Sequence, residues 1–176
     1  ALQAADWDGF AKRRKAAKRA GKLRGIGLAM FLEPSGGMGK EQVEIRVGSD
    51  GKLAMYSNAG PSGQGHETVF PALVADVLGF PEDRIELRAN DIATPKLLGT
   101  GSFGSRSLIC HGAALQTAAK EIVEKGRKLA ATELEVAPTD VTFDKGQYRV
   151  TGTDLSISIK TLIEKKTGTV TLFAFA

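Results

Sequence analysis

Cysteine and histidine are scarce in this chain of 176 residues. Cys110 is its only cysteine, and His66 and His111 are its only histidines. A lone cysteine cannot form an intrachain disulfide, and it cannot supply the several thiolates of a cysteine-built zinc site. A two-histidine site would need a nearby carboxylate, and the sequence suggests none. We therefore expect no metal ligated by protein side chains, and the single thiol is more typical of an intracellular protein.

Long hydrophobic runs are also missing. The apolar stretches fall short of the roughly 20 residues that cross a bilayer, so we expect no membrane-spanning segment. Hydrophobic residues make up 42% and charged residues 25% of the chain, which is typical of a globular protein. The length suits one domain with a substantial core, or two very small ones.

Acidic residues are absent from residues 11–24, which carry eight lysines and arginines. Elsewhere 16 basic residues face 20 acidic ones, so the net charge of +4 comes from this one cluster. Asp6 can cap a helix that runs to about Ala20, with Gly21 as its stop. We expect residues 1–23 to form a basic helix that docks by an apolar stripe. Nucleic-acid binding, or contact with a neighbouring domain or subunit, is the alternative.

The rest of the chain alternates between strand and helix patterns. The apolar run at 24–32 predicts a buried strand, and Ser49-Asp50-Gly51 predicts a hairpin turn between strands at 42–47 and 52–57. Further patterns predict helices over 67–78, 107–134 and 158–165, a strand at 84–89, a hairpin of 141–143 with 148–150, and a last strand from 170. Because that strand is apolar to its final residue, we expect a truncated chain. We expect an α+β fold over residues 24–176, a layered sandwich of helices on a mixed, largely antiparallel sheet.

Two glycine-rich loops open predicted helices and are the strongest candidates for a binding site. Glycine lets backbone approach a ligand closely, and a helix N-terminus attracts anions. The first loop comprises Gly63, Gln64, Gly65, His66, Glu67 and Thr68; the second comprises Thr100, Gly101, Ser102, Gly104, Ser105, Arg106 and Ser107. A cation beside a helix start is unfavourable unless an anion binds there, so Arg106 strengthens the second candidate. The alternatives are an ordinary turn for the first loop and a flexible, serine-capped loop for the second.

Other motifs fit known chemistry poorly. Residues 34–40 resemble a P-loop but lack its first glycine and its Ser or Thr. Residues 99–104 read G-x-G-x-x-G but do not directly follow a strand, as a dinucleotide fingerprint must. Asp91 could serve as a general base, but no opposing partner is evident. Cys110 and His111 are adjacent on a predicted helix, so they would not face each other as a nucleophilic pair.

The ordered set of motifs resembles the molybdenum hydroxylases, the family of xanthine dehydrogenase, aldehyde oxidase and aerobic carbon monoxide dehydrogenase. The similarity is to the molybdopterin-binding C-terminal half of the large subunit. In that family a Gly-Ile-Gly strand precedes a Gly-Gln-Gly-His-x-Thr loop, a helix ending Ala-Asp-x-Leu-Gly, a Pro-x-Asp-x-Ile strand and a Gly-Ser-Arg-Ser loop. Their counterparts here are residues 25–27, 63–68, 75–79, 81–85 and 104–107, with Gly152-Thr153 also matching.

The resemblance implies that both loops grip a molybdopterin cytosine dinucleotide or molybdopterin, whose sulfurs hold the molybdenum. It implies FAD and 2Fe-2S centres on partner domains or subunits, and hydroxylation of an aldehyde, N-heterocycle or similar small substrate with water. The family's catalytic glutamate lies in a Gly-x-Gly-Glu loop that this sequence lacks, so we expect no catalytic residue here and no activity of the isolated chain.

Further expectations follow from the resemblance. Partners are the remainder of the large subunit, the flavin and iron–sulfur partners and the substrate. We expect a cytoplasmic location, with the periplasm as the alternative for the parent protein. One departure is Asn90-Asp91-Ile92-Ala93, where the family has Gly-Asp-Thr-Asp. A non-catalytic phosphate or nucleic-acid binding module, using residues 11–24 and the two loops, is the alternative function.

Overall fold

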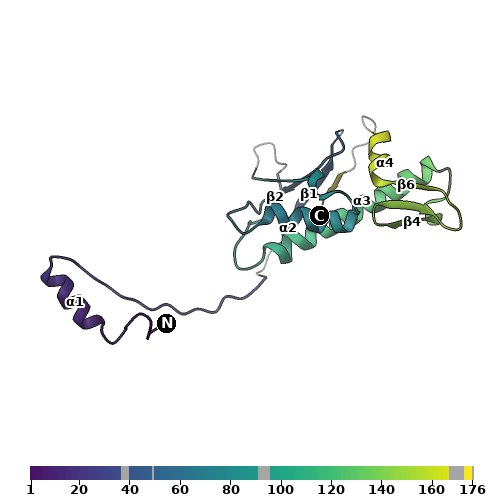
Figure 1. The fold of residues 1–176 in the computed structure, drawn as a ribbon. Coiled ribbons are helices and arrows are strands. Elements are labelled where there is room, and N and C mark those ends of the chain that lie inside the picture. The colour runs from purple at the N-terminus through teal and green to yellow at the C-terminus, as the bar shows by residue number, and fades with distance from the viewer. Residues whose placement is uncertain (37–39, 49, 91–95, 167–172, 176) are drawn as a thin grey trace. The chain divides into compact units, whose positions relative to one another are not determined.

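The computed structural model describes residues 1–36, 40–48, 50–90, 96–166 and 173–175 (Figure 1). They divide into two compact units, Ala1–Glu33 and Pro34–Ala176. Helices and strands are interspersed along the chain, which confirms the predicted α+β class. No helix in the described ranges is both long and apolar enough to span a bilayer.

The N-terminal unit contains one helix, α1 (Phe10–Arg19). It begins later than predicted, at Phe10, although the Asp6 carboxylate accepts a hydrogen bond from the Gly9 N–H at 3.2 Å. The predicted strand at 24–32 is wrong, since these residues join no strand. A strand needs a neighbour for its N–H and C=O groups, and the backbone of the only other element in this unit is satisfied within its own helix.

The first sheet of the larger unit has the strand order β3-β2-β1-β7. Its strands are β1 (Val43–Val47), β2 (Leu53–Ser57), β3 (Ile85–Ala89) and β7 (Phe173–Phe175). The predicted hairpin of β1 and β2 is confirmed, with Val43 opposite Ser57. β3 runs parallel to β2, which requires a crossover, and helix α2 (His66–Leu78) supplies it. The end of β2 therefore leads directly into the first glycine-rich loop.

The second sheet is a separate antiparallel meander of β4 (Val141–Asp144), β5 (Gln147–Val150) and β6 (Ser156–Ser158). Lys145 and Gly146 both have positive φ, at 43° and 80°, as a tight two-residue hairpin turn requires. Helix α4 (Ile159–Lys166) follows, and the Ser158 hydroxyl caps it by accepting from the Thr161 N–H at 2.9 Å. The hairpin and the helix were predicted, but the sequence indicated one sheet rather than two.

Helix α3 (Gly112–Glu133) runs from one sheet to the other and contacts α2 (Figure 1). A π-helical turn, Ser107–His111, precedes it, and 3₁₀ turns at Glu82–Arg84 and Pro138–Asp140 lead into β3 and β4. The buried face of α2 includes Phe70, Val74 and Leu78. Leu108, on the π-helical turn before α3, is 55% exposed.

Candidate functional site

The first glycine-rich loop joins the end of β2 to the start of α2. Gly63 and Gly65 adopt the left-handed conformation, with φ of 89° and 78°, and Gly65 is the residue that caps α2. A Cβ at either position would meet nothing within 4 Å, so the positive φ, rather than lack of space, favours glycine. No side chain caps this helix start, which leaves its N–H dipoles available to an anion.

The second loop leads from Thr100 into the π-helical turn. Gly101, Gly104 and Ser105 have positive φ, and Ser105 is one of few non-glycine residues in this conformation. The hydroxyls of Ser102 and Ser107 lie 2.6 Å apart, closing the loop across its own base. A π-helical turn often marks a functional site, because it displaces side chains from regular helical positions.

The two loops meet in space. The Gln64 side-chain amide donates to the Ser102 hydroxyl at 3.4 Å, and an open pocket of about 410 Å³ lies between the loops. Six predicted site residues line it: Gln64, His66, Ser102, Gly104, Ser105 and Ser107. Four apolar side chains that were not predicted complete the lining: Val69, Phe70, Phe103 and Leu108. Their only signal in the sequence is that they neighbour predicted residues.

The remaining predicted residues do not line the pocket. Gly63 and Gly65 shape the first loop, while Glu67 and Thr68 are exposed in the first turn of α2. Thr100, Gly101 and Arg106 lie at the two ends of the second loop. Asp91 lies outside the described residues.

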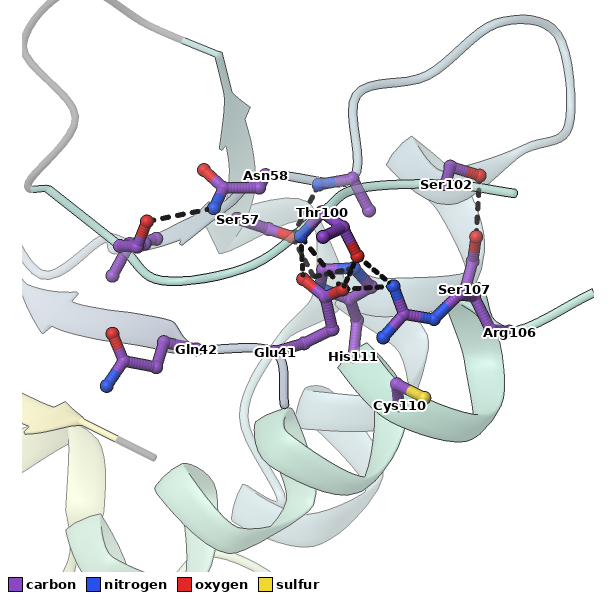
Figure 2. Close-up of polar contacts among 12 residues, drawn as sticks. Glu41, Gln42, Ser57, Asn58, Thr100, Ser102, Arg106, Ser107, Cys110 and His111 are labelled. Atoms are coloured by element: carbon purple, nitrogen blue, oxygen red, sulfur yellow. Dashed lines mark hydrogen bonds and ion pairs between the residues drawn. The ribbon is translucent and has the colours of Figure 1, made fainter. Parts of the chain in front are cut away.

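A buried charged cluster lies at the base of the second loop (Figure 2). Glu41, just before β1, and Arg106 have fully buried side chains, and their Oε1 and NH1 atoms lie 2.5 Å apart. Glu41 also accepts hydrogen bonds from the Thr100 N–H at 3.0 Å and from the Thr100 hydroxyl at 2.9 Å. Burial alone would raise the pKa of Glu41, but the Thr100 hydrogen bonds, helped by the charge of Arg106, lower it. Glu41 is therefore held as a carboxylate.

Arg106 is not free to reach the pocket in this structure. Its NH1 also donates to the Thr100 hydroxyl, and its guanidinium lies 4.9 Å from the centre of the Phe103 ring. Its Nε and NH2 atoms find no hydrogen-bond partner among the described residues. The argument from sequence placed an anion beside this cation, and the structure supplies one in the form of Glu41.

His111 connects the charged cluster to the first loop. Its Nε2 lies 3.3 Å from Glu41 Oε2, and its Nδ1 lies 3.1 Å from the Ser57 hydroxyl. Ser57 accepts from the Ala59 N–H, and the Ala59 carbonyl accepts from the His66 ring. Burial lowers the pKa of His111, although the Glu41 carboxylate opposes this shift, so the ring is neutral near pH 7. In this neutral ring Nδ1 accepts from the Ser57 hydroxyl, while Nε2 faces the Glu41 carboxylate without forming a hydrogen bond among the described residues.

Sequence reasoning missed Glu41 and Ser57 and gave His111 only a packing or hydrogen-bonding role. Glu41 precedes Thr100 by 59 residues, and no local motif surrounds it. Among the residues that the structure places, no group of three His, Cys, Asp or Glu side chains could hold a metal ion.

Comparison with known proteins assigns the family. Residues 1–174 match the model of the molybdopterin cofactor-binding domain. The chain is 32% identical to the gamma subunit of the 6-hydroxypseudooxynicotine dehydrogenase complex of Paenarthrobacter nicotinovorans, over 90% of this chain and 20% of that protein. It is 33% identical to the carbon monoxide dehydrogenase large chain of Hydrogenophaga pseudoflava, over 84% of this chain and 20% of the relative.

Comparison with solved structures supports the same family assignment. A crystal structure of Cu,Mo-CO dehydrogenase superposes with a TM-score of 0.73 and 28% identity, covering 99% of this chain and 25% of the other. Quinoline 2-oxidoreductase from Pseudomonas putida 86 gives a TM-score of 0.68 and 25% identity over the same shares of both chains. The chain spans about a fifth of the length of the curated relatives it matches. None of these matches favours a nucleic-acid module. The chain belongs to the molybdopterin cofactor-binding domain family of the molybdenum hydroxylases.

Proposed function

We propose that this chain forms one wall of a molybdopterin-dinucleotide site in the large subunit of a molybdenum hydroxylase. The observation that carries the proposal is the single pocket lined by both glycine-rich loops. Serine hydroxyls of the second loop and the uncapped start of α2 suit a diphosphate. Phe103, which is 56% exposed, offers a flat apolar surface to a heterocyclic ring. The lining thus fits a ligand that carries both phosphate and ring systems.

Individual residues would hold different parts of the cofactor. The Gln64 amide, which lines the pocket, can donate hydrogen bonds to phosphate oxygens. Thr68 and Glu67 lie outside the lining, so they would meet only a part of the cofactor that extends beyond the pocket: the Thr68 hydroxyl would donate to phosphate, and the Glu67 carboxylate would accept from the N–H groups of a pterin. Arg106 would stabilise the anionic ligand through its charge, from below the loop. The glycines and Thr100 would give the loops their shape.

The proposal extends to the longer protein. When bound, the cofactor supplies oxygen transfer from water to a substrate carbon. Following the family resemblance, the substrate is an aldehyde, N-heterocycle or similar small molecule, and the cofactor is molybdopterin cytosine dinucleotide, with molybdopterin as the alternative. FAD and 2Fe-2S partners receive the electrons, and the cytoplasm is the proposed location, with the periplasm as the alternative. The chain alone would be inactive, and its affinity for the cofactor would be weak.

The test uses two proteins, the full-length subunit and this chain, and each is measured separately. We expect the purified subunit to contain molybdenum and pterin in equal amounts, and this chain to bind cytidine diphosphate in calorimetry. Ser105→Ala should weaken that binding, whereas Thr117→Ala on the exposed face of α3 should leave it unchanged. A full-length subunit purified with complete occupancy by another cofactor would contradict the proposal.

A further inference from the structure

The carboxylate of Glu41 contacts both ends of the second loop. Thr100 precedes the pocket-lining residues of this loop and Arg106 follows most of them, and both bind Glu41 (Figure 2). Between them lie Gly101, Gly104 and Ser105, all with positive φ. Such a segment has little intrinsic preference for one conformation, so its shape depends on how its ends are held.

The surroundings of Glu41 are shaped to admit its side chain. A Cβ at Gly99 would lie 2.0 Å from Glu41 Oε2, so no larger residue fits there without displacing the carboxylate. The neighbouring Gln42 fixes the approach to the loop: its backbone N–H donates to the Leu98 carbonyl at 2.8 Å, and its side chain accepts from the Leu98 N–H at 2.7 Å. The approach to the loop is thus tied to the residues that open β1.

The same carboxylate reaches the first loop through His111. Glu41 lies against the His111 ring, His111 meets Ser57, and Ser57 holds the Ala59 N–H. The Ala59 carbonyl then accepts from His66, whose ring lines the pocket. A continuous line of polar contacts therefore runs from one pocket wall to the other, below the pocket surface.

Removal of the Glu41 charge has a defined consequence. Arg106 has no other anionic partner in the cluster, and its Nε and NH2 atoms are already unpaired. A buried guanidinium without a counter-charge is strongly unfavourable, so Arg106 would move toward water and carry the adjoining Ser105 and Ser107 with it.

We propose that Glu41 is a positioning residue that fixes both pocket loops, through Thr100 and Arg106 on one side and His111 on the other. Its relevance to cofactor binding rests on the proposed function. The positioning itself does not, because it concerns the chain without a ligand. Arg106 acts in this arrangement as part of the support for the loop.

Hydrogen exchange of this chain without ligand tests the positioning. Glu41→Gln should accelerate exchange of the amides at 100–107 at least tenfold. Leu162→Ala, in the core near the second sheet, is the control and should accelerate exchange only as far as its effect on overall stability dictates. Adding Arg106→Gln to Glu41→Gln removes the uncompensated charge but does not restore the carboxylate that binds Thr100, so it should restore the protection only in part. If Glu41→Gln does not fold, Glu41→Asp keeps the charge on a shorter side chain and should show the same local pattern.

The outcomes separate the two proposals. Exchange at 100–107 that matches the Leu162→Ala control, or full recovery of the protection in the double variant, would overturn the positioning role. Cytidine diphosphate binding is then measured on the same proteins, and Glu41→Gln should raise the Kd at least tenfold while Leu162→Ala leaves it unchanged. Failure of the unmodified chain to bind this probe would count against the proposed function alone, and the exchange data would still decide the role of Glu41.

Discussion

Single residues at the base of the loop are constrained by space as much as by backbone conformation. Gly99 illustrates this because its missing side chain leaves room for the Glu41 carboxylate. Gly63 is constrained by conformation alone, since a Cβ there would meet nothing within 4 Å. The two positions therefore separate a steric requirement from a conformational one.

We predict that Gly99→Ala is more destabilising than Gly63→Ala. The first change drives a methyl group into a buried ion pair, whose disruption adds to the cost of overpacking, whereas the second adds only the strain of a positive φ. The difference in the free energy of unfolding should be about 1–3 kcal/mol, measured by urea denaturation. Equal losses in the two variants would show that the loop can shift to accommodate the methyl group.

The second residue-scale prediction concerns pH. The folded state lowers the pKa of His111 below 6.5 and that of Glu41 below 4.5. A group with a lowered folded pKa takes up protons more readily when unfolded, so its contribution to stability is present above the ordinary pKa and is lost as pH falls. Stability should therefore decrease first below about pH 6.5, through His111, and again below about pH 4.5, through Glu41.

Urea denaturation from pH 8 down to well below the ordinary pKa of Glu41 measures both steps. His111→Gln should remove the step that begins near pH 6.5 and retain the acidic one. A stability that stays constant from pH 7 to pH 5 in the unmodified chain would contradict the assignment of a buried, neutral His111.

At the scale of elements, α3 and β5 are fitted to each other at a single glycine. Gly126 lies within α3, and a Cβ there would lie 2.0 Å from the Tyr148 hydroxyl of β5. That hydroxyl is buried and donates to the Val123 carbonyl at 3.1 Å. Burial raises the pKa of Tyr148, so the hydroxyl stays protonated and remains a donor at any ordinary pH.

This contact predicts a reversal of the usual glycine-to-alanine effect. In an exposed helix interior the change stabilises by about 1 kcal/mol, but Gly126→Ala should destabilise because the methyl group meets Tyr148. Tyr148→Phe alone should cost about 1 kcal/mol for the lost hydrogen bond. In the double variant Gly126→Ala should cost less than in the unmodified chain, and a thermodynamic cycle from urea denaturation measures this coupling. If the two substitutions had additive effects on the free energy of unfolding, positions 126 and 148 would not be in contact.

Local signals in the sequence were enough to predict most elements. The turns at Asp50-Gly51 and Lys145-Gly146, and the Ser158 cap, act within a few residues, and the structure contains each of them. The run at 24–32 shows the limit of this reasoning. Its apolar character is typical of a buried strand, but whether a strand forms depends on a partner that the local sequence does not specify.

The residues of the site also divide into those that local sequence predicted and those that it did not. Backbone-shaping glycines and hydroxyls follow each other along the chain, so both loops were recognised, and the structure places them around one pocket. The link between them depends on Glu41, whose partners Thr100 and Arg106 are brought to it by the crossover from β2 through α2 to β3. Chain topology of this kind cannot be derived from residue spacing, which is why Arg106 was assigned an external anion.

At the scale of the whole molecule, the two sheets share one hydrophobic core. The core cluster contains Val43 and Met55 from the first sheet as well as Tyr148 and Ile157 from the second. The hairpin turn also packs closely on the end of α2, since a Cβ at Gly79 would lie 2.2 Å from the Lys145 carbonyl carbon. The unit formed by Pro34–Ala176 should therefore unfold as a single cooperative body, despite its two sheets.

Two core substitutions at opposite ends of this unit test that cooperativity. Leu115→Ala in α3 and Leu162→Ala in α4 each remove a fully buried side chain and should each cost about 2–5 kcal/mol. In both variants hydrogen exchange should accelerate together in β1, β2 and β5, and circular dichroism should show one urea transition. Trp7 lies in the N-terminal unit, so its fluorescence is not a suitable probe of this transition. If Leu162→Ala accelerated exchange only in β4, β5 and β6, the second sheet would be a separate folding unit. The pocket loops would then depend on the first sheet and its helices alone.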